Sequence, residues 1–305
     1  MVSPAMVSTL AAPAAPAPTI RAVFETGSEQ EYEASLRTEI TQARNGSAPE
    51  ASLVEHAATV RLLVESAEAD GSLKLLARIT KLKLAWKAPR ASAEFSADAE
   101  NEPDKKPAAD METAEGELAA LGRAIMVSSI TMTIGPSGEV REISGLEQVL
   151  ESLKNIHQID ERAVGFFTPL RFGQFLAPMI DAAGARDRPV VPGETWTREE
   201  EPTVLRPLGK ITPTTTYTMR DSGPHRATIE GATSFDFQRD PGADPSVPTL
   251  TIGANTTTTS LTWDTARNRL VSRERTQDLS TTWTLGDITI EQTQHSVSRL
   301  ALRAP

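Results

Sequence analysis

The sequence predicts an α+β fold, in which a long, curved, half-barrel-like antiparallel β-sheet packs around two or three amphipathic helices. Long stretches near both ends of the chain alternate apolar and polar residues, as half-buried strands do. Two segments in the middle, residues 144–157 and 169–182, instead repeat apolar residues at helical spacing. Turn-forming pairs such as Asp70-Gly71 separate the predicted strands.

The first strands are expected at residues 31–42, 56–66 and 72–86. Asp70-Gly71 predicts a tight hairpin between the last two. In residues 72–86 the apolar positions change parity, from Leu75 and Ile79 to Leu82 and Leu84. An extra residue turns all later side chains to the opposite face, so the change predicts a bulge near Thr80.

The middle of the chain predicts a loop, a hairpin and the first long helix. Residues 94–117 are acidic and rich in alanine and proline, which is typical of a mobile, solvated loop, and a short helix is expected at 117–123. Residues 126–134 and 139–143 are expected to pair across a Gly-Pro-Ser-Gly turn. Ser144 followed by Glu147 predicts a capping box at the start of a helix.

A second apolar helix is expected to begin at Thr168-Pro169. Half of the phenylalanines of the chain lie between residues 166 and 175. This concentration predicts the lining of an apolar ligand pocket, formed by Phe166, Phe167, Phe172, Phe175, Leu176 and Met179. The alternative is that these side chains are ordinary core.

The last third of the chain is expected to be β-rich. A strand containing Trp196 precedes predicted strands at residues 210–219, 225–238, 249–263, 270–285 and 287–302. The final strand has apolar ends and a polar middle on one parity, which indicates a sheet that outgrows its helices or faces a partly wet cavity. The threonine runs at 212–218 and 256–259 are expected on exposed sheet faces.

Length and composition indicate one domain over residues 25–303 after an Ala/Pro-rich tail at 1–24. The net charge of −10 argues against a nucleic-acid partner. The chain has no cysteine and no run of ~20 apolar residues, so we expect no disulfide and no transmembrane span. The tail resembles a tether left after signal-peptide removal, which predicts a periplasmic or secreted protein. A cytoplasmic protein with a disordered terminus is the alternative.

The search for chemical motifs gives no catalytic pattern. A nucleophile elbow, a phosphate-binding glycine loop and a paired-histidine zinc motif are all missing, and the four histidines are far apart in the sequence. We therefore expect no metal, no cofactor and no enzymatic activity, and an enzyme stays a third possibility beside the two functions given below.

Three short motifs carry a family resemblance: Ala120-Leu121-Gly122, Gly138-Glu139-Val140 and the Pro192-Gly193-Glu194-Thr195-Trp196 segment. With them the chain resembles a family of bacterial envelope proteins of unknown function. The order of elements is also similar to that of lipoprotein carriers, antiparallel half-barrels wrapped around helices. This resemblance implies binding of an acyl chain or another apolar molecule.

Two functional hypotheses follow. In the first, the protein is a non-enzymatic binding module that holds an apolar or lipid-like ligand between the sheet and the helices. In the second, it is a structural or interaction protein of the envelope, with a filled core and a protein partner bound at a sheet edge or a threonine-rich face.

Overall fold

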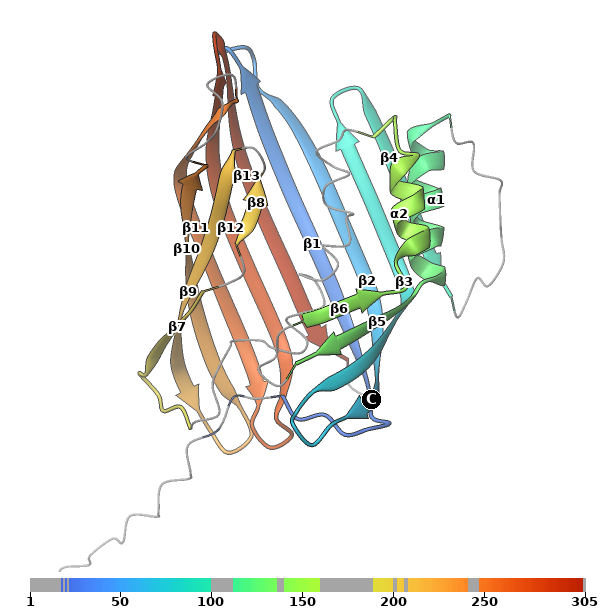
Figure 1. Ribbon diagram of the computed structural model, residues 1–305, viewed down its shortest axis with the longest axis vertical. Coiled ribbons are helices and arrows are strands. Elements are labelled where there is room, and N and C mark those ends of the chain that lie inside the picture. The colour runs from blue at the N-terminus through green and yellow to red at the C-terminus, as the bar shows by residue number, and fades with distance from the viewer. Residues whose placement is uncertain are drawn as a thin grey trace, which may run out of the picture.

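The computed structural model describes residues 22–99, 112–135, 140–159, 189–199, 202–205, 208–240 and 247–303, together with Pro18 and Ile20. In these residues one antiparallel sheet of 13 strands dominates, accompanied by two short helices (Figure 1). The strands are β1 (Glu29–Arg44), β2 (Glu50–Ala67), β3 (Leu73–Ala88), β4 (Ala91–Asp98), β5 (Ser129–Ile134), β6 (Val140–Ser144), β7 (Thr195–Glu199), β8 (Thr203–Leu205), β9 (Gly209–Ser222), β10 (Ala227–Arg239), β11 (Thr249–Asp264), β12 (Arg269–Leu285) and β13 (Ile288–Leu302). The helices are α1 (Ala114–Val127) and α2 (Glu147–Lys154). The predicted curved antiparallel sheet is confirmed, but the protein is mostly β.

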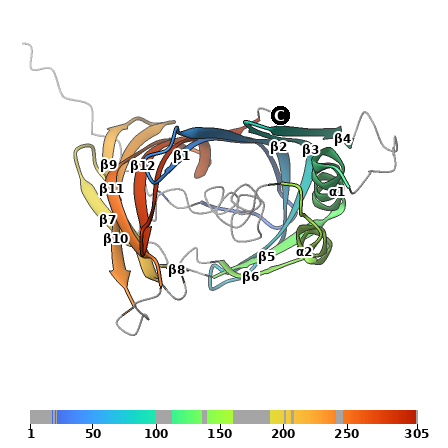
Figure 2. The ribbon, with the colours of Figure 1, turned by 90° about the horizontal axis from the view of Figure 1, so that it is seen from above.

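The sheet joins the two ends of the chain at its centre. Its strand order is β6-β5-β3-β2-β1-β13-β12-β11-β10-β9-β7, with β4 paired to β3 and β8 paired to β9. The first strand, β1, therefore lies beside the last, β13, over a register that runs from Tyr32 opposite Leu302 to Arg44 opposite Ile290. Figure 2 shows the strong curvature of the resulting ribbon.

Local turn chemistry fixes the hairpins. Asn45 and Gly46 both have positive φ, 50° and 70°, which suits a tight reversal from β1 into β2. The predicted turn at Asp70 is confirmed, and its carboxylate accepts a hydrogen bond from the backbone N–H of Ser72 at 2.8 Å. That bond holds the pKa of Asp70 below its usual value.

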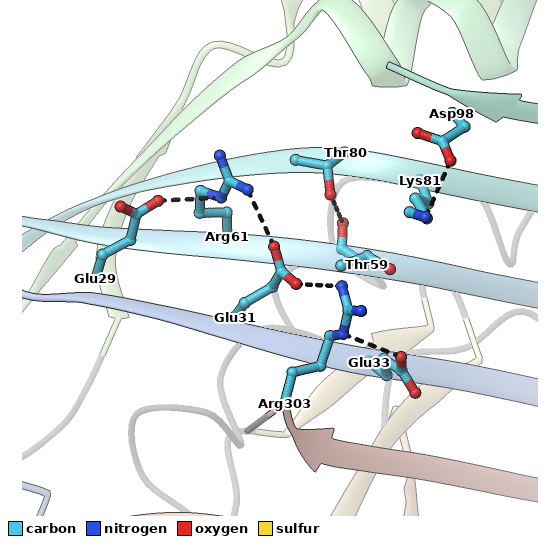
Figure 3. Close-up of polar contacts among 9 residues, drawn as sticks. All are labelled: Glu29, Glu31, Glu33, Thr59, Arg61, Thr80, Lys81, Asp98 and Arg303. Atoms are coloured by element: carbon cyan, nitrogen blue, oxygen red, sulfur yellow. Dashed lines mark hydrogen bonds and ion pairs between the residues drawn. The ribbon is translucent and has the colours of Figure 1, made fainter. Parts of the chain in front are cut away.

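The bulge predicted near Thr80 is confirmed at that residue. Thr59 of β2 pairs with Lys81, and the next residue, Val60, pairs with Ile79, so Thr80 is the extra residue on β3. Its hydroxyl donates to the Thr59 carbonyl at 3.4 Å (Figure 3). The bulge is also where β3 changes its neighbour, from β5 along residues 73–78 to β4 along residues 81–88.

The first helix begins earlier and ends later than predicted. It extends through Met126 to Val127, so Met126 belongs to α1, and the strand expected from residue 126 starts at Ser129. Thr113 caps the helix, because its hydroxyl accepts from the Gly116 backbone N–H at 3.0 Å.

The predicted capping box at Ser144 is wrong. Ser144 ends β6, and α2 has Leu146 as its N-cap, with no side-chain hydrogen bond to the cap. Gly145 intervenes with a φ of +83°, and a Cβ there would lie 2.1 Å from the Ser129 carbonyl oxygen. The close turn from β6 into α2 therefore requires a glycine, and this geometry replaces the capping box.

The described helices do not lie within the curve of the sheet as predicted. Figure 2 shows both at one end of the ribbon, with α1 beside β3 and β4, and α1 also contacts α2. Gly122 lets α1 approach β4 closely, since a Cβ at that position would lie 2.2 Å from the Phe95 ring. The helix expected at 169–182 lies outside the described residues.

Both ends of the acidic segment predicted as a loop at 94–117 are structured. Residues 94–98 complete β4, which the sequence analysis missed, and α1 begins at Ala114. The short strand β8 was also missed. The β4 sequence is mostly alanine, serine and acidic residues, with Phe95 as its one large apolar side chain, so its composition resembles that of the residues that follow.

Burial separates the sheet into two faces. The inner face is defined by Tyr32, Val60, Leu75, Leu261 and the residues in register with them, and it carries the hydrophobic core. The opposite, outer face carries charged side chains paired across strands. Arg61 on β2 lies 3.0 Å from Glu29 and 3.2 Å from Glu31, and Arg303 continues the chain of ion pairs from Glu31 to Glu33 (Figure 3).

Candidate ligand-binding face

The six residues predicted to bind an apolar ligand lie outside the described residues, as does the helix that would carry them. They are Phe166, Phe167, Phe172, Phe175, Leu176 and Met179. Their role stays a prediction. The predicted site would have the inner face of the sheet as its opposite wall, and the residues of that face define the candidate site.

The inner face is densely filled at one end of strands β9 to β13. Met219, Ile229 and Leu261 are cross-strand neighbours and are 0%, 0% and 1% exposed. Trp263 and Leu270 are buried beside them. This end is ordinary hydrophobic core.

Toward the other end of the same strands, large apolar side chains on the inner face remain half-buried. They form the apolar patch, which consists of Ile211, Phe235, Phe237, Ile252, Leu279, Trp283 and Ile290. The register places Trp283 between Leu250 and Ile290, and Phe237 opposite Ile211. Incompletely buried apolar surface of this kind is typical of a contact site.

A row of hydroxyl and amide side chains separates the filled end from the apolar patch. This polar belt consists of Thr38, Thr215, Thr233, Thr257, Gln277 and Ser296, which are in register across β9 to β13 and β1. The Thr215 and Thr233 hydroxyls are 2.8 Å apart, and those of Thr38 and Ser296 are 3.0 Å apart. The prediction that the threonine runs face solvent is therefore wrong for Thr215, Thr257 and Thr259, which are buried.

Two arginines of β12 project from the inner face. Arg273 and Arg275 are in register with Leu261 and Thr259 of β11 and with Leu300 and Ser298 of β13. The Nε of Arg275 is buried and has no hydrogen-bond partner. On the outer face, by contrast, the Nε of Arg299 lies 2.8 Å from Glu274.

The electrostatic surroundings of Arg275 contain no compensating acid on the neighbouring strands. In the described residues of β9 to β13, no Asp or Glu occupies an inward-facing position, although the chain as a whole carries a charge of −10. The acids of β12, Glu274 and Asp278, project from the outer face and pair there with Arg299 and His295. The inner face of this part of the sheet is therefore positively charged.

The aromatic pair Trp196 and Tyr217 lies on the same inner row as Arg275. Their rings stack at 5.7 Å between centroids, with an interplanar angle of 25°. Tyr217 extends over Gly231 of β10, where a Cβ would lie 3.0 Å from its ring. Glycine at that position lets the ring lie flat along the sheet.

His56 of β2 projects from the same face in an apolar setting, between Leu36 of β1 and Leu84 of β3. Its Nε2 is buried. Burial lowers the pKa of His56 to about 4, because the charged imidazolium loses its hydration. His56 is therefore neutral at pH 7.

The described residues contain no group of three or more His, Cys, Asp and Glu side chains placed to hold a metal ion. A shallow hollow of about 290 Å³ lies where β1, β2 and β3 end, beside Ile40, Leu53 and Pro89. Because it is small and open, it can enclose only a minor part of a ligand. No helix in the described part of the chain has both the length and the apolar character needed to cross a membrane.

The sequence analysis located the strands of this face but did not single out Arg275 or the apolar patch. A signal was present in the predicted strand at 270–285. Arg273 and Arg275 share the parity of Leu279 and Trp283, and alternation places residues of one parity on one face. Two arginines in phase with apolar residues predict inward-facing cations.

No protein-family model matches the chain, and no curated protein matches it. Among solved structures, one described as lipid–protein interactions in lipovitellin aligns with a TM-score of 0.46 and 11% identity, covering 92% of this chain. This chain spans 26% of that lipovitellin chain. Two further structures are more distant. DynF from the dynemicin biosynthesis pathway of Micromonospora chersina aligns with a TM-score of 0.17 and 8% identity, over 97% of this chain and 92% of that chain. OpdQ of Pseudomonas aeruginosa aligns with a TM-score of 0.22 and 6% identity, over 90% of this chain and 99% of that chain. These similarities are too low to assign a family or a function.

Proposed function

We propose that the protein is a non-enzymatic binding module that holds an apolar or lipid-like ligand against the inner face of the sheet. The half-buried apolar patch is the observation that supports this function. A filled core would bury Phe237, Leu279 and Trp283 as completely as it buries Met219 and Leu261, and it does not. At the patch β12 is paired on both sides, with β11 and β13, which gives Leu279 and Trp283 a rigid support for binding.

The same patch extends far enough along the sheet for a chain-like ligand. From Leu279 to Leu285, inward positions on β12 are Leu279, Thr281, Trp283 and Leu285, and Leu285 is 42% exposed. At ~3.3 Å per residue this end of β12 alone covers about 20 Å. The predicted Phe-rich segment would supply the opposite wall, and the predicted periplasmic or secreted location would give the module an extracytoplasmic role.

The test is the binding of a neutral apolar dye, Nile red, by purified protein from which bound lipid has been extracted. We expect saturable binding with an increase in fluorescence, and lipid in the extract detected by mass spectrometry. Leu279→Gln, which places an amide in the apolar patch, is expected to weaken dye binding at least tenfold.

Thr282→Gln is the matched control, because Thr282 lies on the outer face of the same strand. It is expected to bind the dye as the unmodified protein does. Circular dichroism and thermal unfolding establish that both variants are folded. Absence of both dye binding and co-purified lipid contradicts the binding function and favours the interaction protein, whose partner would then be sought by pull-down.

A further inference from the structure

We propose that the ligand is an anionic amphiphile, a long acyl or alkyl chain with a carboxylate or phosphate head group, and that Arg275 binds the head group. This inference rests on the proposed function and specifies its ligand. Its basis is the position of an unpaired guanidinium between the polar belt and the core, on the strand that also carries the centre of the apolar patch.

The first argument is the unfulfilled hydrogen-bonding capacity of Arg275. A guanidinium presents five donors in a planar fork that matches the oxygens of a carboxylate or phosphate. In the described structure Arg275 makes no ion pair, and its Nε is both buried and without an acceptor. The guanidinium of Arg275 therefore has donors available for the oxygens of an anionic group.

The second argument is the sign of the surrounding charge. Arg273 precedes Arg275 by two residues on the same face, about 7 Å away along the strand. The inward positions of the described strands β9 to β13 carry no carboxylate. A second positive charge on this face adds to the attraction of the site for an anion.

The third argument is the row of groups around Arg275. Its cross-strand neighbours on the inner face are Thr259 and Ser298, and Gln277 follows it on β12. Hydroxyl and amide groups donate hydrogen bonds to anionic oxygens without adding charge. The same row continues from Thr259 to Gly231 of β10, and the Tyr217 ring extends over Gly231.

The fourth argument is the distance between the head-group site and the apolar patch. Arg275 and Trp283 are eight residues apart on the same face of β12, a separation of about 26 Å at ~3.3 Å per residue. Leu279 lies midway. An extended chain of about sixteen carbons anchored at Arg275 would therefore follow the strand across Leu279 toward Trp283.

The experiment compares three ligands that share one alkyl chain and differ in the head group: hexadecanoate, hexadecyl phosphate and hexadecanol. The measurement is the displacement of Nile red from the lipid-extracted full chain at pH 7.5. Each ligand is used at concentrations below those at which it aggregates. We expect at least one anionic ligand to bind ten or more times more tightly than the alcohol, and which of the two it is identifies the head group. We expect this preference to diminish at high salt.

Arg275→Gln is expected to reduce the preference to less than threefold while hexadecanol and Nile red bind as before. Arg299→Gln is the matched control, because it removes an arginine from the outer face of the neighbouring strand, and it should retain the full preference. A structural role for Arg275 would instead lower the unfolding temperature of the ligand-free protein and weaken all three ligands equally.

The outcomes separate the two proposals. If the three ligands bind equally well, or if Arg275→Gln retains the anion preference, the head-group assignment is wrong and the apolar binding function stands. If neither the dye nor any of the three ligands binds, the binding function itself is wrong.

Discussion

The Glu117 carboxylate of α1 binds the backbone of Gln158, which follows α2 in the chain. The Gln158 N–H donates to both carboxylate oxygens, with N···O distances of 2.8 and 3.0 Å. The same carboxylate accepts from the N–H groups of His157 and Ile159, at 2.6 and 3.2 Å, and Glu117 is only 1% exposed. This side chain therefore joins α1 to the segment that leaves α2.

Replacing Glu117 with Gln is expected to lower the free energy of unfolding by about 3 kcal/mol. The amide keeps the size of the side chain but offers a single neutral acceptor to three backbone N–H groups, and hydrogen bonds to charged groups contribute ~1.5–3 kcal/mol each. Urea unfolding measures the change. Glu115→Gln, an exposed position in the first turn of the same helix, is the control and should change stability by less than about 0.5 kcal/mol. Equal effects at the two positions would contradict the assigned role of Glu117.

The bulge at Thr80 allows a sharp test of the sheet register. Deletion of Thr80 joins Ile79 directly to Lys81 and leaves Leu82 and Trp86 on the inner face, because the bulge contributes one extra residue. We expect this deletion variant to fold, with a modest loss of stability from the lost hydrogen bonds to Thr59 and from Ala99.

Deletion of Lys83 is the matched comparison, because it removes one residue from a regular part of β3. It turns Leu84 and Trp86, which are 1% and 3% exposed, to the solvent side. At ~1.5–3 kcal/mol for each large apolar side chain, the loss should exceed about 3 kcal/mol. The unfolding temperatures of the two deletion variants measure the difference. Equal losses of stability in the two variants would show that Thr80 is not the extra residue of β3.

His56 should make stability depend on pH. Its pKa is about 4 in the folded protein and about 6.5 when unfolded, so the unfolded chain takes up a proton first as the pH falls. Neutral His56 therefore costs no stability above pH 6.5. As the pH falls toward 4, the free energy of unfolding decreases by up to about 3 kcal/mol, because the unfolded chain is protonated at this residue and the folded protein is not. Urea unfolding at pH 7.5, 6 and 4.5 measures this trend. The non-titrating variants His56→Leu and His56→Gln should both lose this part of the pH dependence, whatever their stability at pH 7.5, and retention in both would contradict the assignment.

Most strands could be predicted from the sequence because alternation and turn residues are local signals. The hairpin at Asp70 and the bulge at Thr80 follow from a few adjacent residues. The pairing of β1 with β13 connects opposite ends of the chain, and no local pattern specifies it. Helix placement is likewise a tertiary property, so the apolar stripe of α2 indicated that it packs but not on which surface.

The candidate site was harder to predict because its residues contradict simple composition rules. Glu117 lies in an acidic segment that indicated solvent exposure, yet backbone N–H groups compensate its burial. Threonine is common on wet sheet surfaces, yet Thr215 and Thr257 are buried in the polar belt. Arg275 could be found from its parity alone, but its isolation from carboxylates depends on the register of three strands.

Gly122 and Phe95 should show strong energetic coupling. An added Cβ at Gly122 would lie 2.2 Å from the Phe95 ring, well inside contact distance. Gly122→Ala should therefore destabilise the protein by about 1–3 kcal/mol, although alanine favours a helix over glycine by ~1 kcal/mol. In a Phe95→Ala background the ring is removed, and the same Gly122→Ala change should then be neutral or stabilising. Urea unfolding of the four proteins gives the coupling energy, which we expect to exceed 1 kcal/mol by this estimate. Additive effects would mean that α1 does not pack against β4 through this pair.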